Sequence, residues 1–260
     1  MVRSRRQRLG HDMWIFAGGM FRSGSTLQFQ LISTLIERSS LGRRLEWRTP
    51  EDFAGLAEQL GDPSEMLVFK THVCKHPMRI RLLDGRARAV AVHRDLRDVI
   101  VSGAHKDGIS PTPDYCSEMT KGCLACYNGW PVCEAVRWWA YDRFVDETAD
   151  CIMEMAEHIR VPCDLQTARQ LAEEFSPERQ RKRIDSAIRE GRMRPAIPGD
   201  KRLHAEGDLL HPNHVRDGRT GQWITDLSPD AVRAIETIAG AWLTSHGYRL
   251  SLEPAEKGTA

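Results

Sequence analysis

Residues 18–28, GGMFRSGSTLQ, decide the fold. They follow an apolar run at residues 13–17 (MWIFA), which predicts a short buried strand because the run is apolar throughout and stops at glycine. Leucines at helical spacing over residues 25–37 then predict a helix. A strand, a glycine loop and a helix start together favour an anion site, because free backbone N–H groups and the helix dipole converge there.

The loop comes close to G-x-x-x-x-G-K-[ST], the pattern that holds nucleotide triphosphates. Gly19, Gly24 and Thr26 match this pattern, but Ser25 stands in place of the lysine. Because that lysine reaches the outer phosphates of the nucleotide, its absence disfavours a triphosphate as the ligand. The side chains that the loop offers to an anion are those of Arg22, Ser23, Ser25 and Thr26.

Strands and helices alternate through the N-terminal half. Apolar runs at residues 66–69 and 87–92 predict two more buried strands, and residues 95–104 follow as a helix. Thr49 before Pro50 predicts another helix start, with its end at Gly61. This alternation implies an α/β fold, with a parallel sheet covered by helices on both faces.

The C-terminal half is less regular. Residues 106–131 are rich in Gly, Pro and Cys and predict a long ordered loop or lid. Residues 134–158 predict one long helix, because apolar side chains recur there at helical spacing. Further helices are expected at residues 164–175, 177–190 and 228–247, with an irregular stretch at 191–222.

The composition excludes several classes of protein. The 260 residues are 41% hydrophobic and 28% charged, as in soluble globular proteins, and the net charge of +1 gives no bulk basicity for nucleic-acid binding. No apolar run approaches the roughly 18 residues of a membrane span. The apolar stretch after the basic N-terminus is too short for a signal peptide. Seven cysteines, an odd number, without a signal peptide favour reduced thiols in a cytoplasmic protein. From the charge and the lack of a long apolar run, we expect neither nucleic acid nor membrane as partner.

Polar side chains follow two of the predicted strands. Lys70 and His72 come just after the strand at 66–69, and a histidine there is a candidate general base near neutral pH. Arg94 comes at the end of the strand at 87–92, and Ser102 lies about two helical turns later. Open α/β sheets bind ligands at this edge.

Two other features carry charge near these positions. If these residues have no binding role, we expect Arg97 and Asp98 to form a local ion pair. The loop VRDGRTGQW, at residues 215–223, is punctuated by glycines and contains Arg216 and Arg219. By itself, such a loop predicts no more than a basic turn.

Taken together, these segments resemble the sulfotransferases that use 3′-phosphoadenosine-5′-phosphosulfate (PAPS). That family shows P-[KR]-S-G-[ST]-T, K-T-H, R-D-x-R-D-x-x-x-S and R-K-G-x-x-G-x-W in this order. Here the segments read FRSGST at 21–26, KTH at 70–72, RDLRDVIVS at 94–102 and RDGRTGQW at 216–223. The resemblance implies a P-loop NTPase-like sulfotransferase fold in one domain over residues 13–250, between a disordered start at 1–12 and a tail at 251–260.

The resemblance also implies which residues bind the donor. The loop that holds the 5′-phosphosulfate is matched by Arg22, Ser23, Gly24, Ser25 and Thr26. The ligands of the 3′-phosphate are matched by Arg94 and Ser102, with Arg216 and Gly218 as the distal clamp. Leu27 replaces the aromatic residue that often stacks on adenine, and Asp217 replaces a lysine of the clamp, for which Arg219 is the candidate substitute.

Three residues match catalytic positions of the family. His72 matches the general base that takes the acceptor proton, and Lys70 matches a lysine that helps to stabilise the transferring group. Arg22 stands where the family often has lysine; since arginine stays protonated, it stabilises charge on the leaving phosphate without acting as an acid. Members resembling the tyrosylprotein enzymes use a glutamate after the first helix, so Glu46 is a rival base.

The implied reaction moves a sulfuryl group from PAPS to a hydroxyl or amine of a small-molecule acceptor and leaves 3′,5′-ADP. Two other functions remain open: a P-loop small-molecule kinase, and a non-catalytic nucleotide-binding protein of the same fold. The oligomeric state also remains open, with a homodimer among the options. The aromatic candidates for an acceptor pocket are Tyr127, Trp130, Trp138 and Trp139, with Trp138 and Trp139 alternatively part of a helix core.

Four cysteines gather in the segment CSEMTKGCLACYNGWPVC. Its central C-x-x-C suits one tetrahedral zinc, although the flanking gaps are not a familiar zinc spacing. Free thiols and a redox pair are the alternatives, and the resemblance requires no metal. The cysteines concerned are Cys116, Cys123, Cys126 and Cys133.

Overall fold

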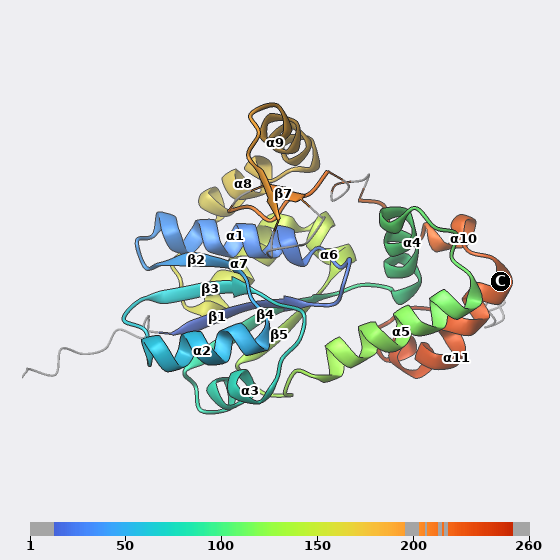
Figure 1. Ribbon diagram of the computed structural model, residues 1–260, viewed down its shortest axis with the longest axis horizontal. Helices are drawn as coiled ribbons and strands as arrows, with labels where there is room; N and C mark the ends of the chain where they lie inside the picture. The colour runs from blue at the N-terminus through green and yellow to red at the C-terminus, as the bar shows by residue number, and fades with distance from the viewer. Residues whose placement is uncertain (1–12, 196–202, 206, 213–214, 216–217, 252–260) are drawn as a thin grey trace, which may run out of the picture. The chain divides into compact units, whose positions relative to one another are not determined.

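The structure is a computed structural model, and it describes residues 13–195, 203–205, 207–212, 215 and 218–251. The described chain divides into two compact units. Unit 1 comprises Met1–His93 and Cys126–Gly218, and unit 2 comprises Arg94–Ala125 and Arg219–Ala260. Each unit therefore consists of two separate stretches of the chain (Figure 1).

Within the described residues, unit 1 holds a five-stranded sheet in the order β2-β3-β1-β4-β5, and every neighbouring pair is parallel. The parallel α/β sheet predicted from the sequence is therefore confirmed. Since the strands are parallel, their carboxyl ends share one edge, and the central strand β1 ends in the middle of it. The strands are β1 (Trp14–Gly19), β2 (Gly42–Trp47), β3 (Met66–Lys70), β4 (Ala87–His93) and β5 (Val136–Ala140).

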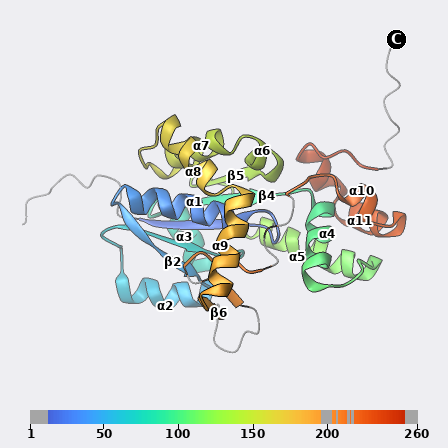
Figure 2. The same ribbon diagram turned by 90° about the horizontal axis from the view of Figure 1, so that it is seen from above.

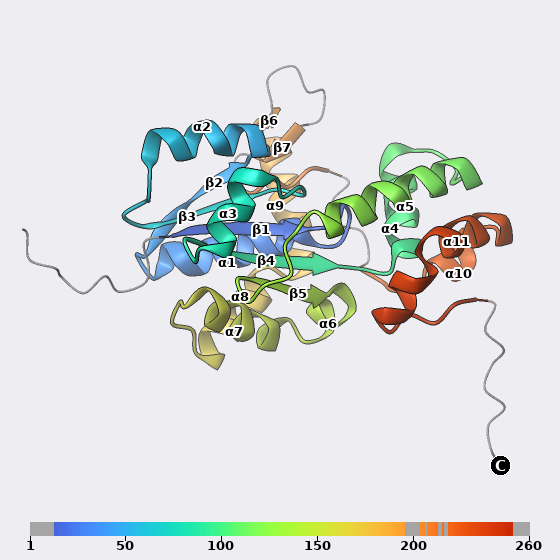
Figure 3. The ribbon, with the colours of Figure 1, turned by 90° about the horizontal axis from the view of Figure 1, so that it is seen from below.

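Helices cover both faces of this sheet because the central strands are apolar on both sides. Ile15 packs into a core with the helices α1 (Ser25–Arg38), α7 (Thr148–Ile159) and α8 (Leu165–Glu174). Trp14 and Phe16 pack on the opposite face with α2 (Pro50–Leu60) and α3 (His76–Leu83). Figure 1 shows α1 on one side of the strands and α2 and α3 on the other, and Figure 3 shows α3 in front of the strands.

Further elements of unit 1 lie over α1. Helix α9 (Pro177–Arg189) crosses α1 in the view from above (Figure 2), and the Gln180 amide Nε2 of α9 donates to Gln30 Oε1 of α1 at 2.5 Å. Strand β6 (Met193–Pro195) pairs antiparallel with β7 (Leu203–Ala205), inside the stretch expected to be irregular. The sequence prediction missed this hairpin, as it missed β2 and α3.

The long helix predicted at residues 134–158 is wrong. The chain forms β5, then α6 (Tyr141–Asp146) and α7. In β5, Val136 and Trp138 pack on the α2 side of the sheet and Trp139 on the α1 side, which is the alternation of a strand. Valine and tryptophan favour strands, and their spacing with later apolar residues imitated a helical stripe.

The loop predicted at residues 106–131 is also wrong, because α5 (Pro113–Asn128) fills most of it. The Thr112 hydroxyl accepts the backbone N–H of Tyr115 at 3.3 Å, as a helix N-cap does. The Thr112-Pro113-Asp114 signal is of the same kind as Thr49-Pro50, which correctly predicted α2 with its capping box. The prediction gave more weight to the glycine and cysteines of this segment, which are typical of loops, than to that helix-start signal.

In unit 2, the described elements are helical. They are α4 (Leu96–Asp107), most of α5, the short α10 (Trp223–Asp226) and α11 (Pro229–Ser245). The predicted cap Ser228 accepts the Ala231 N–H with its hydroxyl. No helix among the described residues is long and apolar enough to cross a membrane.

Candidate active site

The loop between β1 and α1 depends on glycine at two positions. Gly19 has φ +136°, and a Cβ there would come within 2.7 Å of the Val92 carbonyl oxygen on β4. Gly24 has φ 86° and is the N-cap of α1. A side chain at either position would strain the backbone, so the loop keeps its close approach to β4 only with these glycines.

Ser23 ties this loop to the sheet. Its hydroxyl lies 2.7 Å from the Met20 carbonyl oxygen and 2.8 Å from that of Val92, both of which accept. Ser23 is fully buried. Since a carbonyl oxygen only accepts, the hydroxyl proton is directed at the loop and β4, and Ser23 can offer an anion its backbone N–H.

The start of α1 has the donors of an anion site. Gln28 N–H makes the first helical bond, to the Gly24 carbonyl, so the N–H groups of the preceding turn have no intrahelical partner. The Thr26 hydroxyl is buried and has no hydrogen-bond partner among the described residues. Arg22, just before this turn, has φ 57°, the left-handed conformation that helps successive N–H groups to converge.

His72 is fixed beside this loop. Its Nδ1 lies 2.9 Å from the Gly19 carbonyl oxygen, and its ring packs 4.6 Å, between centroids, from that of Phe21. Because the carbonyl can only accept, Nδ1 carries the proton, and in the neutral ring Nε2 is the basic nitrogen. Lys70 is the last residue of β3, opposite Ala17 of β1, and is buried.

Glu46, the rival base, has another contact. Its Oε1 accepts the backbone N–H of Gly207 at 2.9 Å, and Glu46 has φ 60° at an irregularity of strand β2. Nearby, Arg44 donates to the carbonyl of Gly207 and pairs with Asp208. These bonds anchor residues 207–208 to β2, a structural role that sequence analysis did not anticipate.

In unit 2, Arg94 is held by two groups. Its Nη2 donates to the Arg219 carbonyl oxygen at 2.7 Å and lies 3.5 Å from Asp98 Oδ2. Arg94 and Asp98 are both buried. The structure thus brings Arg94 together with Arg219, the candidate substitute for the missing lysine of the distal loop.

The local ion pair expected between Arg97 and Asp98 is wrong. Arg97 makes a two-pronged contact with Asp95 and donates to Glu236 at 2.7 Å, and its guanidinium lies 3.8 Å from the Trp223 ring centroid. Asp95 is the N-cap of α4, and its carboxylate accepts the backbone N–H of Arg97 as well. Arg97 is thereby directed toward α11 and Trp223 rather than along its own helix.

Two more of the residues predicted to bind the donor lie among the described residues. Ser102 is buried on α4 in unit 2. Gly218 has φ 72°, a conformation that favours glycine, and belongs to unit 1. Arg216 and Asp217 lie outside the described residues.

The predicted aromatic pocket loses two of its members to the core. Trp130 packs on Gly18, where a Cβ would come within 2.6 Å of the indole, and Trp139 is 3% exposed with Nε1 donating to Glu154. Tyr127 and Trp138 are half-buried, and their rings pack against each other tilted by 37°, with centroids 4.4 Å apart. Only this second pair has surface left to offer an acceptor.

The zinc site, one of the alternatives for the four cysteines, is not formed among the described residues. Cys116, Cys123 and Cys126 lie on α5 and Cys133 follows it, and the described residues contain no group of three or more metal-binding side chains. Burial raises the pKa of Cys116 and of Cys126 to about 11, which keeps both thiols protonated at neutral pH.

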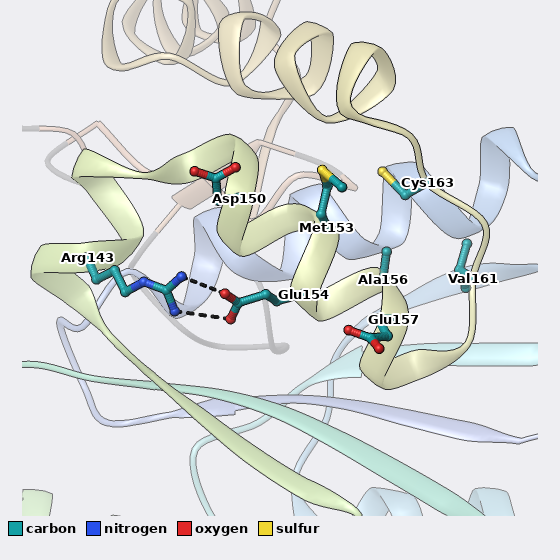
Figure 4. A pocket seen from close by; sticks show the side chains of 8 residues that line it. All are labelled: Arg143, Asp150, Met153, Glu154, Ala156, Glu157, Val161 and Cys163. Atoms are coloured by element: carbon teal, nitrogen blue, oxygen red, sulfur yellow. Dashed lines mark hydrogen bonds and ion pairs between the residues drawn. The ribbon is translucent and has the colours of Figure 1, made fainter.

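A surface pocket of about 550 Å³ lies along α6 and α7 (Figure 4). Arg143 points at Glu154 across it, with Nη2 2.5 Å from Glu154 Oε1. None of its lining residues is a predicted site residue. They are Arg143, Asp150, Met153, Glu154, Ala156, Glu157, Val161 and Cys163.

Comparison with known proteins places this geometry in a family. The sequence matches the family model of the sulfotransferase domain over residues 15–247. A search of curated proteins finds no match. The structure is similar to mouse sulfotransferase SULT7A1 complexed with PAP, with a TM-score of 0.61 and 13% sequence identity over 90% of this chain and 84% of that chain.

Retinol dehydratase is similar as well. Its complex with androsterone and the inactive cofactor PAP gives a TM-score of 0.59 and 17% identity, over 92% of this chain and 83% of that chain. Its complex with retinol and PAP gives 0.55 and 18%, over the same shares of the two chains.

These solved structures confirm the predicted fold, and the family match confirms the predicted enzyme class, a transferase of sulfuryl groups. They do not favour the kinase alternative. Over most of its length, this chain belongs to the sulfotransferase domain family.

Proposed function

We propose that this enzyme transfers the sulfuryl group of PAPS to a hydroxyl or amine of a small-molecule acceptor and releases 3′,5′-ADP. The observation that carries the proposal is the pairing of two features in unit 1. One is a loop with a buried Thr26 hydroxyl that has no hydrogen-bond partner in the described part of the chain, and the other is a histidine held against that same loop by the Gly19 carbonyl. PAP in the similar solved structures supports PAPS as the donor.

The loop suits a 5′-phosphosulfate. The N–H groups of the first turn of α1 and the Thr26 hydroxyl supply hydrogen bonds to anionic oxygens. Arg22 supplies the positive charge, and no lysine is required because the donor has neither a γ-phosphate nor a need for Mg²⁺. Ser23 keeps the loop in place through Met20 and Val92.

His72 serves as the general base. Its Nε2 takes the proton of the acceptor as the acceptor atom bonds to sulfur, and the bond between sulfur and the bridging oxygen breaks. Arg22 stabilises the negative charge that builds on that leaving oxygen, and Lys70 helps to stabilise the transferring group. The bond from Nδ1 to the Gly19 carbonyl fixes the ring and supports the cation that forms once Nε2 is protonated.

We assign the 3′-phosphate to the residues that match the family's ligands for that group. Arg94, Ser102 and Arg216 are its side-chain ligands, Arg219 adds charge, and Gly218 allows the turn of the distal loop. The contact between the Arg94 guanidinium and the Arg219 carbonyl supports this assignment. The single domain over residues 13–250 stays a prediction from the sequence.

The acceptor is a small molecule, and retinol dehydratase, which has a similar structure, binds the small molecules androsterone and retinol in its complexes. The Phe21 ring, which is 37% exposed and packs on His72, and the Tyr127–Trp138 pair are the candidates to contact its apolar part. Homodimer formation and a cytoplasmic location stay predictions from the sequence.

The experiment is incubation of the enzyme with radiolabelled PAPS and fractionated host extract, followed by mass spectrometry of the labelled product. The proposal predicts a sulfated small molecule with wild type, formed about 10²–10⁴-fold more slowly by His72→Ala. Label transfer from ATP would point to the kinase, and 3′,5′-ADP binding without sulfate transfer to any fraction would point to a non-catalytic protein.

A further inference from the structure

Asp98 binds three groups at once. Its Oδ2 accepts the Gly221 N–H at 2.8 Å, its Oδ1 accepts the Trp223 N–H at 3.1 Å, and Arg94 Nη2 lies 3.5 Å from Oδ2. The side chain is 1% exposed, so water does not compete for these contacts. All of these groups belong to unit 2.

A second set of bonds closes the arrangement. The Arg219 carbonyl accepts from Arg94 Nη2 at 2.7 Å and from Gln222 Nε2 at 3.0 Å. Residues 219–223 are therefore bonded to Arg94 through one carbonyl and to Asp98 through two N–H groups. The Trp223 ring also packs on Arg97, which Asp95 and Glu236 hold.

We propose that Asp98 is a positioning residue for the 3′-phosphate of the donor. It fixes the Arg94 guanidinium and the backbone of residues 221–223 relative to each other before nucleotide binds. This inference rests on the proposed function, because it assumes that Arg94 and the distal loop bind that phosphate.

Electrostatics supports a positioning role rather than direct contact. A carboxylate beside a phosphate repels it. A buried aspartate near the 3′-phosphate therefore weakens nucleotide binding unless its own bonds hold the arginine that binds that phosphate in place. Asp98 makes such bonds: its two oxygens match two backbone donors, and its charge faces Arg94. A guanidinium held in one orientation presents its planar fork to a phosphate without losing further conformational freedom on binding.

The variant Asp98→Asn tests this with little change in shape. An amide offers one oxygen, so its NH₂ group meets either the Gly221 or the Trp223 N–H, donor against donor. The charge that faces Arg94 is lost as well. We expect the affinity for 3′,5′-ADP to fall roughly tenfold or more, while that for 5′-ADP stays nearly unchanged.

Glu236→Gln is the matched control. Glu236 is also a buried carboxylate of unit 2, but its partners are Arg97, the Ser251 N–H and the Ser251 hydroxyl. The substitution removes the same charge from the same unit and leaves the contacts of Asp98 with Arg94, Gly221 and Trp223 in place. It reaches the Trp223 ring only through Arg97. We expect a lower melting temperature with the preference for 3′,5′-ADP retained.

The experiment is calorimetric titration of 3′,5′-ADP and 5′-ADP into wild type and both variants, with thermal melts of each. The quantity compared is the ratio of the affinity for 3′,5′-ADP to the affinity for 5′-ADP. A drop in this ratio for Asp98→Asn but not for Glu236→Gln supports the inference. An unchanged ratio in Asp98→Asn, or an equal drop in both variants, overturns it. A wild type that does not distinguish the nucleotides overturns the 3′-phosphate assignment itself, and the inference with it.

If Asp98→Asn does not fold, Asp98→Glu carries the same test. It keeps the charge but moves the carboxylate by one methylene, so the two backbone bonds are not made together. A ratio several-fold below that of wild type supports the inference, and the wild-type ratio overturns it.

Discussion

The loop between β1 and α1 in unit 1 is ordered by its backbone, whereas residues 94–98 of unit 2 are ordered by paired charges. In the loop, Gly19 and Gly24 allow the path and the Ser23 hydroxyl ties it to β4. Around Arg94, buried arginines meet buried carboxylates and the backbone of residues 219–223. A backbone site leaves N–H groups for the ligand, while a site of paired charges holds its cations in place.

The two regions should therefore respond differently to mutation. Changes at the loop and at His72 should affect the transfer step, which takes place where charge moves. Changes around Arg94 should affect how strongly the donor is held and how well its 3′-phosphate is recognised. The following predictions test that division.

The largest effect is expected for His72→Ala. Loss of a general base typically lowers the rate by about 10²–10⁴-fold, so kcat should fall by that factor while 3′,5′-ADP binds normally. Steady-state kinetics with PAPS measures kcat, and calorimetry measures the affinity for 3′,5′-ADP. Glu46→Gln is the control, because glutamine can still accept the Gly207 N–H, and it should stay near wild type. The opposite pattern would move the base to Glu46.

Arg22→Ala should come next. Removing one group that stabilises developing charge costs about 10²–10³ in kcat. Arg22→Lys should recover part of the activity, because lysine supplies the charge without the planar fork. Full activity in Arg22→Ala, measured in the same assay, would exclude a role for Arg22 in stabilising the leaving phosphate.

In unit 2, Arg94→Ala should lower the affinity for 3′,5′-ADP by about 10- to 10²-fold, the worth of one charge-assisted contact. The affinity for 5′-ADP should change little. Titration of both nucleotides measures this, and an equal loss for the two would show that Arg94 supports the fold rather than recognising the 3′-phosphate.

The smallest effect is expected for Ser23→Ala. It removes the hydroxyl that lies between two carbonyl oxygens, which should lower the free energy of unfolding by about 1 kcal/mol. Urea denaturation measures this. A large loss of 3′,5′-ADP affinity with unchanged stability would instead indicate that the Ser23 hydroxyl binds the donor directly.

Local signals in the sequence predicted much of this molecule. The apolar runs of β1, β3 and β4 were found because buried parallel strands are apolar on both faces, and α2 was found because Thr49 and Pro50 mark a helix start. The failures at β5 and α5 are also local. At Trp138 and Trp139, the spacing of apolar side chains fits a helix as well as a strand, and the chain forms β5. At α5, the Gly and Cys content favoured a loop, although Thr112-Pro113 is a helix-start signal.

The contacts within the candidate site could not be predicted from local sequence patterns, because they join residues far apart in the chain. Asp98 and Gly221 are 123 positions apart, and nothing near Asp98 in the sequence indicates a backbone partner in the distal loop. The bond from His72 to the Gly19 carbonyl likewise follows from the pairing of β3 with β1. The motifs predict the candidate site residues, and the sheet order and the contacts between distant parts of the chain determine what holds them.

The most direct test of the donor assignment is calorimetric titration of wild-type protein with 3′,5′-ADP, 5′-ADP and ATP, with and without Mg²⁺. Two or three charge-assisted bonds to the 3′-phosphate predict a preference of about 10²-fold or more for 3′,5′-ADP over 5′-ADP, without Mg²⁺. Equal affinity for these two nucleotides, or binding that requires Mg²⁺ and favours ATP, would contradict PAPS as the donor.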